Sequence, residues 1–211
     1  MSGHIKTIDY KTAISFLLPL HYSGRKPQIK WAFGWYFDDV LSAVCTFGKP
    51  ASNTLCDGIC GKELSGSVYE LNRLCRIDGL KNQLSEFVSH CLRAISDNNL
   101  IIVSYADTGM NHSGYIYQAC NFIYTGCTKQ RLEFHVDGGH SRHGSKDSEF
   151  RKIRTSKHRY VYFATASKRI RKQYKSELRY KQERYPKEEN ANYVLGNYMK
   201  PTIVKYTGKK A

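Results

Sequence analysis

The sequence lacks a long hydrophobic run. No apolar stretch approaches the ~18 residues that a membrane-spanning helix requires, and the brief one at residues 13–20 is interrupted by Ser15 and Pro19. That stretch also lacks a small-residue cleavage site, so the N-terminus carries no sign of an export signal. Hydrophobic residues still make up 41% of the 211 residues and aromatic residues 13%, which argues against disorder. We expect a soluble protein.

The sequence also lacks a disulfide framework. Its seven cysteines are an odd number and are scattered along the chain, a pattern typical of reduced thiols in a cytoplasm. Cys56 and Cys60 form a C-x3-C pair, but no second pair follows at the spacing of a zinc site. The alternative interpretation is a glycine-punctuated loop in which the two buried thiols act as small hydrophobic groups.

Acidic residues are scarce relative to basic ones. The chain has 18 Asp and Glu against 33 Lys and Arg, a net charge of +15, and the excess is uneven: residues 139–185 hold fifteen basic and four acidic side chains. This asymmetry indicates a polyanionic partner, and the interleaved aromatic residues are suited to stacking on bases. We predict DNA contacts for six side chains: Lys157, Arg159, Lys168, Arg169, Arg171 and Lys172.

The alternative for part of this basic stretch is an ordinary solvated helix. Ile170, Tyr174 and Leu178 recur at i, i+4 spacing, with charged residues between them, as on a helix that packs along one face. The two interpretations are compatible, because one face of a helix can pack while the other binds DNA.

The hydrophobic periodicity predicts a succession of strands and helices. Asp38–Asp39 separates two apolar runs and predicts a hairpin, and residues 78–96 show the i, i+3, i+4 spacing of an amphipathic helix. The continuous apolar run at 100–107 is typical of a central strand. The predicted strands are 29–37, 40–47, 67–77, 100–107, 131–138, 158–165 and, at the end, 201–206; the other predicted helices are 114–120 and 167–181.

This order predicts one α+β domain with a single central crossover. We expect residues 1–138 to supply the N-terminal part of the core. Residues 139–211 are expected to complete the same domain with a basic C-terminal extension that contacts DNA.

Polar side chains crowd the end of the predicted central strand. The run 101–105 leads into Asp107 and then, past a glycine, into His112, and the ends of buried strands are where α/β folds usually place their chemistry. Ser104, Asp107 and His112 are therefore candidate catalytic residues. Each also has a structural alternative: Ser104 satisfies backbone groups, Asp107 caps the following turn, and His112 is an exposed loop residue.

Two further segments could contribute to a site. His21 and Tyr22 occupy a second polar loop between apolar segments; we favour His21 as a base or ligand and Tyr22 as a stacking or hydrogen-bonding partner, the alternative being a structural pair. A histidine and carboxylate set could hold a non-haem iron, although its spacing does not establish a site. That set is His135, Asp137, His140 and His143.

Several motifs, in order, resemble the phage Mu Mom family of adenine-modification proteins. They run from about His21 to Lys187 and comprise LPLHYSGRKP, LCDGICGKE, ELNRLCRIDG, LSEFVSHCLRAI, IIVSYAD, IYQACNFIYTG and RYP. The resemblance implies a fold similar to GNAT N-acetyltransferases, with a mixed, mostly antiparallel sheet flanked by helices. It also implies conversion of adenine in phage DNA to N6-(carbamoylmethyl)adenine, which blocks host restriction enzymes, and hence action in the cytoplasm of a bacterial host.

The resemblance also implies where a cofactor would bind. In GNAT enzymes the loop after the fourth strand holds the pyrophosphate of acetyl-CoA, and that loop corresponds here to Arg76, Gly79, Lys81 and Asn82. Lys81 stands where the superfamily has a second glycine. Tyr117 matches a tyrosine that commonly protonates the leaving thiolate, with Asn121 in place of the following glycine.

An enzyme that acts on the N6 amine of duplex adenine must first reach a paired and stacked base. Base flipping, at a cost of a few kcal/mol, is the expected route. Aromatic residues that could stack on the displaced base are Tyr22, Trp31, Trp35 and Tyr36, although the last three are more often core residues. Two other functions explain part of the sequence, a non-enzymatic nucleic-acid-binding protein and an ordinary GNAT acetyltransferase.

Overall fold

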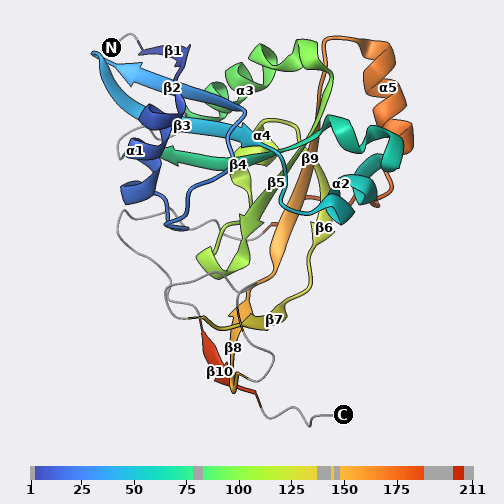
Figure 1. The fold of residues 1–211 in the computed structure, drawn as a ribbon. Coiled ribbons are helices and arrows are strands. Elements are labelled where there is room, and N and C mark those ends of the chain that lie inside the picture. The colour runs from blue at the N-terminus through green and yellow to red at the C-terminus, as the bar shows by residue number, and fades with distance from the viewer. Residues whose placement is uncertain (1–2, 78–82, 137–143, 145–147, 188–201, 207–211) are drawn as a thin grey trace.

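A seven-stranded sheet in the order β1-β2-β3-β4-β5-β9-β6 forms the centre of the computed structural model, which describes residues 3–77, 83–136, 144, 148–187 and 202–206 (Figure 1). Only β4 and β5 pair in parallel; the other neighbours are antiparallel. The strands are β1 Gly3–Thr7, β2 Trp31–Phe37, β3 Val40–Gly48, β4 Val68–Arg76, β5 Leu100–Asp107, β6 Ile123–Cys127 and β9 Lys157–Ala164. The predicted α+β class is confirmed.

The predicted hairpin is confirmed in β2 and β3. Asp38 and Asp39 form its turn with φ angles of 46° and 61°. Two consecutive positive φ angles are the geometry of a type I′ turn, which matches the right-handed twist of the strands on either side. Strand β1, which the sequence pattern did not predict, pairs with the outer edge of β2.

The parallel pair β4 and β5 stays together over only three residue pairs. Val68 to Glu70 align with Ile101 to Val103, after which β4 continues to Arg76 and β5 to Asp107 without further pairing between the two strands. The two strands therefore diverge in the middle of the sheet. On its other side β5 is paired with β9 along its whole length.

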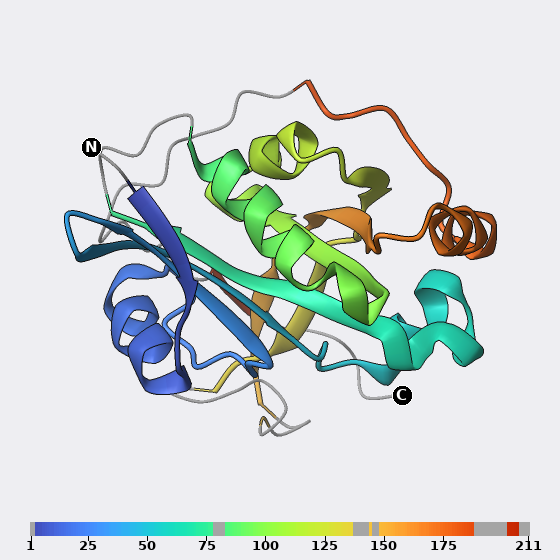
Figure 2. The same ribbon diagram turned by 90° about the horizontal axis from the view of Figure 1, so that it is seen from above.

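Helices cover both faces of the sheet (Figure 2). Helices α3 and α4 lie over one face, where Ile102 of β5 joins their core cluster, and α1 lies over the other. Helices α2 and α5 also pack on the α1 face, around Ile101 and Val103. The α-helices are α1 Tyr10–Leu20, α2 Asn53–Cys60, α3 Leu84–Ala94, α4 Tyr115–Ala119 and α5 Lys168–Glu177, and the 3-10 turns are η1 Lys62–Ser67, η2 Ser96–Asn98 and η3 Thr108–Met110.

One expectation near the helices needs correction, and another is confirmed over the residues that the structure describes. The segment around Cys56 and Cys60 is helix α2, capped by the Ser52 hydroxyl, and not a loop. Its two thiols are buried in the cluster shared with α5, in agreement with their interpretation as small hydrophobic groups. The helix predicted for 78–96 is seen as α3 over Leu84–Ala94, and residues 78–82 lie outside the described part of the chain.

A second, three-stranded sheet projects from the main body, and we call it the arm (Figure 1). Its strands are β7 Arg131–Phe134, β8 Phe150–Arg154 and β10 Ile203–Lys205, in the order β10-β8-β7 and all antiparallel. The sequence pattern predicted β7 and the final strand but not β8. The arm therefore joins three segments that are far apart in the sequence.

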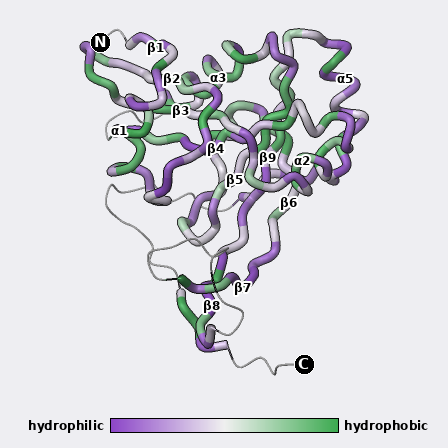
Figure 3. Tube along the Cα trace, viewed as in Figure 1, coloured by the Kyte–Doolittle hydropathy of each residue, from purple (hydrophilic) through white to green (hydrophobic). Residues whose placement is uncertain are grey.

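Hydrophobic residues concentrate in the main sheet, whereas α5 is largely hydrophilic and the arm carries both kinds of residue (Figure 3). Among the described helices, none is both long and apolar enough to cross a membrane. Part of the basic stretch is nonetheless core, because β9 supplies Val161 and Phe163 to the interior. The expected basic C-terminal extension is thus partly built into the sheet.

Candidate functional site

Polar side chains from four segments meet where β4 and β5 diverge. They come from the end of α1, from β4, from the end of β5 with its following loop, and from the start of β9, and their charges act on one another. We call this set the polar cluster: His21, Tyr22, Glu70, Arg73, Tyr105, Asp107, His112 and Lys157.

His21 lies at the C-terminal cap of α1 and is buried. Its Nδ1 accepts a hydrogen bond from the backbone N–H of Ser23 at 3.1 Å, with the Ser23 hydroxyl at 3.0 Å. Burial, together with the positive charge of Arg73 and the nearby His112 and Lys157, lowers the pKa of His21 to about 3. The imidazole is therefore neutral at physiological pH, and an accepting Nδ1 places its proton on Nε2. This arrangement makes His21 a hydrogen-bond donor and a weak base.

Tyr22 links the two polar loops that the sequence singled out. Its ring stacks on His21 with centroids 4.5 Å apart and meets the His112 ring edge-on at 6.1 Å. Burial, reinforced by Asp107 and Glu70, raises the pKa of Tyr22 to about 12. The hydroxyl consequently keeps its proton at neutral pH.

Asp107 is held by several donors at the end of β5. Its Oδ1 accepts from the Gly109 N–H at 3.0 Å and the Thr155 hydroxyl at 2.5 Å, and its Oδ2 pairs with the Lys157 ammonium at 2.5 Å. Although burial opposes it, this bonding lowers the pKa of Asp107 below its usual value. A carboxylate held in this way is a poor proton acceptor and a strong positioning group, and it caps the turn as the structural alternative proposed.

Glu70 and Arg73 are members of the cluster that sequence reasoning missed. Both lie on β4, within the segment ELNR that is part of the family resemblance. Burial raises the pKa of Glu70, although the positive charges of Arg73, Lys157 and Arg154 oppose the rise. Burial likewise lowers the pKa of Arg73. The available signal was a pair of charged side chains inside a strand whose neighbours are mostly apolar.

Ser104 and Tyr117 approach the divergence from the α3 side of the sheet. The buried Ser104 hydroxyl donates to the Leu71 carbonyl at 3.0 Å, one residue beyond the last β4–β5 pair. Tyr117 of α4 is hydrogen-bonded to Ser104, and burial raises its pKa, with Tyr22 and Glu70 adding to the rise. Tyr117 is thus electrostatically coupled to the cluster on the opposite face.

Only part of the predicted cofactor loop can be placed. Arg76 is the last residue of β4, while Gly79, Lys81 and Asn82 lie outside the described residues. Within the described part of the chain, Arg76 Nη1 and Arg73 Nε are buried and make no hydrogen bond. Buried guanidinium N–H groups of this kind are suited to a phosphate or carboxylate.

The six predicted DNA contacts fall in two places. Lys157 and Arg159 lie on β9, but Lys157 pairs with Asp107, and Arg159 donates to the Thr125 side chain and carbonyl and stacks on Tyr180. Arg171 donates to the Thr165 carbonyl. The exposed side chains are those on α5, at Lys168, Arg169, Arg171 and Lys172.

Of the candidate iron residues only His135 is described, and of the candidate stacking residues only Tyr22 belongs to the polar cluster. Among the described residues, no three His, Cys, Asp or Glu side chains come together as metal ligands, and Asp137, His140 and His143 lie outside those residues. Trp35 is a core residue stacked on Phe87 at 5.5 Å. Trp31 packs on Tyr69 and Tyr36 on His4, which leaves Tyr22 as the predicted stacking residue that lies in the cluster.

The family assignment rests on most of the chain. The sequence profile described as the Mom protein family matches residues 2–147, which include α1, β4, β5 and the loop of His112. The chain belongs to the Mom protein family. The comparison with curated protein sequences gave no match.

Solved structures place the fold of this Mom family member among acetyltransferases. An acetyltransferase-type protein of Acinetobacter baylyi is 11% identical, with a TM-score of 0.50 over 77% of this chain and 93% of that one. An N-acetyltransferase of Staphylococcus aureus (11%, TM-score 0.46, 78% and 100%) is also similar. So is the ribosomal-protein-S18-alanine N-acetyltransferase of Escherichia coli (8%, TM-score 0.47, 79% and 96%). The predicted GNAT-like fold is confirmed.

Proposed function

We propose that this protein modifies adenine in DNA, converting the N6 amine to N6-(carbamoylmethyl)adenine. Membership of the Mom family and the GNAT-like transferase fold support a group-transfer enzyme with a DNA substrate. On phage DNA, the modification would protect against host restriction enzymes in the bacterial cytoplasm. The observation that carries the proposal is the polar cluster at the divergence of β4 and β5.

Glu70 is the proposed general base. The N6 amine is a weak nucleophile because its lone pair is delocalised into the ring, and it must lose a proton as the new N–C bond forms. A carboxylate whose pKa is raised by burial accepts that proton more readily than an ordinary one, and Glu70 meets this condition whereas Asp107 does not. Proton transfer from N6 to Glu70 leaves a neutral carboxyl group beside Arg73.

His21 and Tyr22 are the proposed adenine-binding pair. At neutral pH both carry a proton, His21 on Nε2 and Tyr22 on its hydroxyl, so both can donate to ring nitrogens of the base. The stacked His21–Tyr22 pair also offers an aromatic surface of the kind that holds flipped bases. Asp107 and Lys157 would position the loop of His112 against this pair.

The predicted acetyl-CoA loop is compatible with an anionic donor. Arg76, with a buried guanidinium nitrogen that makes no hydrogen bond to described residues, would hold a phosphate, and Tyr117 would hold a proton near the leaving group. Acyl transfer from a thioester would give an N6-amide, so the donor for N6-(carbamoylmethyl)adenine would have to present a methylene carbon that carries both a carboxamide and a leaving group, and N6 would displace that leaving group. The residues of this chain bind and orient the reactants.

The test is the nucleoside content of DNA from bacteria that express the protein. Mass spectrometry should detect adenine nucleoside with an added carbamoylmethyl group, and the peak should be absent with Glu70→Gln. Gln28→Glu, an exchange of the same two side chains at an exposed site, is the matched control and should leave the peak in place.

Three results would point elsewhere. An added acetyl group would indicate an ordinary acetyltransferase. Tight DNA binding by a folded protein, with unmodified nucleosides, would favour the non-enzymatic nucleic-acid-binding protein. A full peak with Glu70→Gln would remove Glu70 as the base while leaving the proposed reaction in place.

A further inference from the structure

The arm presents one face on which basic and apolar side chains alternate. Antiparallel partners point to the same side of a sheet, and the pairs Arg131–Arg154, Glu133–Lys152, Lys152–Ile203 and Phe150–Lys205 therefore define a single face. We call it the basic face: Arg131, Glu133, Phe150, Lys152, Arg154, Ile203 and Lys205. It holds four cations against one carboxylate.

The ends of these side chains reach solvent. The side chains of Arg131 and Lys205 are 63% and 68% exposed, and Phe150 and Ile203 are exposed beside them at 48% and 46%. Glu133 pairs with both Arg131 and Arg154, at 3.3 and 2.8 Å. Glu149 also lies 3.9 Å from the Lys205 ammonium, so two carboxylates offset part of the charge of the four cations and the face keeps a net positive charge.

The opposite face of the arm is held together by contacts of Arg151. Arg151 is buried there, with its guanidinium 4.6 Å from the Phe134 ring and 4.5 Å from the Tyr206 ring. It also donates to the carbonyls of Ser148 and Phe150. These stacking and hydrogen-bonding contacts connect all three strands, so the basic face is a preformed surface.

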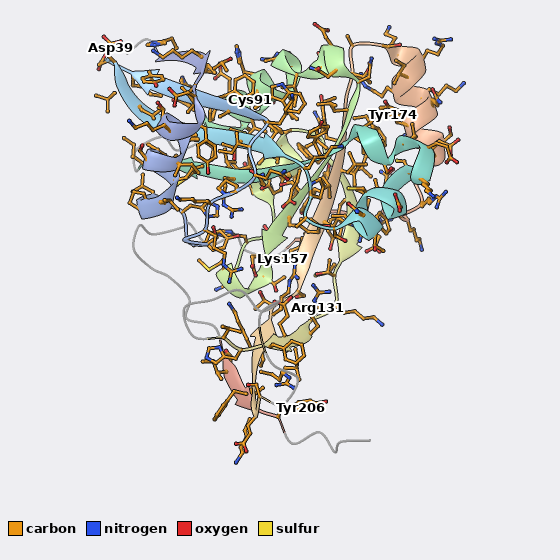
Figure 4. All side chains as sticks on the ribbon, viewed as in Figure 1. Asp39, Cys91, Arg131, Lys157, Tyr174 and Tyr206 are labelled. Atoms are coloured by element: carbon orange, nitrogen blue, oxygen red, sulfur yellow. The ribbon has the colours of Figure 1, made fainter. Side chains whose placement is uncertain are left out.

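The arm begins at the polar cluster. Thr155 and Lys157, which follow β8, both bind the Asp107 carboxylate, and the Thr108 hydroxyl donates to the Ser156 carbonyl at 2.8 Å. Arg154 is close enough to act on the pKa values of Glu70 and Tyr105. In Figure 4, Lys157 lies at the base of the arm, Arg131 further out and Tyr206 near its tip.

The exposed cations of α5 lie much further from the cluster. Tyr174 of α5 donates to the carbonyl of Asn99, directly before β5, whereas Asp107 ends that strand. Eight strand residues at ~3.3 Å each separate the two ends by about 25 Å. Figure 4 shows Tyr174 and Lys157 in different parts of the molecule. A base bound at the cluster would therefore bring its flanking phosphates to the arm before α5.

We propose that the basic face of the arm binds duplex DNA beside the target adenine, with its cations on the phosphates and Phe150 and Ile203 against the groove wall. This inference rests on the proposed function. A five-residue strand is about 17 Å long, and a major groove about 12 Å wide admits a β-ribbon. The dimensions and the charge both fit a duplex.

Two variants with the same loss of charge separate the two basic surfaces. The arm variant carries Arg131→Gln, Lys152→Gln and Lys205→Gln, and the α5 variant carries Arg169→Gln, Lys172→Gln and Lys175→Gln. Binding to a labelled 20-base-pair duplex is measured by fluorescence anisotropy at several salt concentrations. Each phosphate contact contributes about 0.9 to the slope of log affinity against log salt.

We expect the arm variant to bind at least tenfold more weakly and to lose about 2 to 3 from the salt slope, with the α5 variant within about threefold of the unsubstituted protein. A charge-preserving variant, Arg131→Lys with Lys152→Arg and Lys205→Arg, should keep most of the affinity. Equal or larger losses in the α5 variant, or unchanged binding by the arm variant, would overturn the proposal.

A second copy of the chain is the competing partner for an arm with exposed apolar residues. Sedimentation equilibrium on the same variants tests this, and an arm variant that loses a dimer while keeping its DNA affinity would also overturn the proposal.

Nucleoside mass spectrometry run in parallel distinguishes failure of the arm proposal from failure of the proposed reaction. DNA binding through the arm without modified adenine would reject the proposed reaction alone, whereas modification that is unchanged in an arm variant with unchanged binding would reject the arm alone.

Discussion

Glu70 is a carboxyl group in surroundings that disfavour its charge. Burial raises its pKa, while Arg73, Lys157 and Arg154 oppose the rise. Because the folded protein retains the proton of Glu70 to higher pH than the unfolded chain does, this residue makes folding less favourable as the pH rises above about 4.5 through the raised value. A residue that costs stability at neutral pH is more easily explained by chemistry than by packing.

Glu70→Gln should therefore separate activity from stability. We expect the rate of adenine modification to fall by about 10² to 10⁴, the contribution of a general base, while the melting temperature at pH 8 stays the same or rises. Calorimetry and nucleoside mass spectrometry measure the two effects. A large fall in melting temperature would instead assign Glu70 a structural role as the partner of Arg73.

His21 should make the free energy of unfolding depend on pH in the acidic range. Its pKa falls from 6.5 to about 3 on folding, so below pH 6.5 the unfolded chain takes up a proton that the folded protein excludes. The free energy of unfolding should decrease by up to about 1.4 kcal/mol per pH unit from this group between pH 6.5 and 3.

The measurement is urea unfolding at pH 7.0, 6.0 and 5.0 for the unsubstituted protein and for His21→Asn. The variant should show a shallower decrease, with the remaining slope assigned to groups that include His112, whose pKa is also lowered. Parallel pH profiles for the two proteins would show that His21 does not titrate in this way.

Helix α4 depends on a single glycine at its start. Gly114 has a φ of 83°, and a Cβ added there would overlap the Tyr160 ring. Tyr160 in turn donates to the Ser113 carbonyl and accepts from Gln118 at 3.2 Å. This packing fixes the helix that carries Tyr117.

Gly114→Ala should therefore destabilise the protein by at least about 2 kcal/mol, from the left-handed backbone and the overlap together. Gly66→Ala is the control, because a Cβ there meets nothing within 4 Å. Chemical unfolding of both variants checks the difference. Equal stabilities would mean that the Tyr160 ring moves aside at little cost.

At the level of elements, the sequence predicted what depends on local pattern. The β2–β3 hairpin follows from two adjacent aspartates between apolar runs, and α3 follows from its spacing. Helix α1 was missed because Ser15 and Pro19 break its apolar run, although the structure accommodates the proline in the last turn. Strand β8 has no alternating pattern and forms by pairing with β7 and β10, which no local signal records.

The candidate site was predictable in outline only. Polar residues after a buried strand pointed to Asp107 and His112, and the resemblance pointed to Tyr117. The electrostatic character of each residue was not visible, because it depends on neighbours distant in sequence: Asp107 is fixed by Thr155 and Lys157, and Glu70 is affected by Arg154. Those contacts exist only once β9 has joined β5.

On the scale of the whole molecule, the order of the strands in the main sheet differs from their order in the chain. Strand β9 lies between β5 and β6 and covers the full length of β5. The match to the family profile, by contrast, ends at residue 147, before β9 begins. The segment that matches the family profile therefore lacks β9, one of the seven strands of the main sheet.

This strand order has a consequence for synthesis on the ribosome. Until residues 157–164 emerge, β5 has an unpaired apolar edge that is available to other chains. A fragment ending at residue 147 should therefore aggregate, and adding a synthetic peptide of residues 155–187 during refolding should recover soluble protein, as measured by light scattering. The nascent chain is thus exposed to misassembly from the completion of β5 at residue 107 until β9 is complete at residue 164, and the last strand of the main sheet to be made ends that risk.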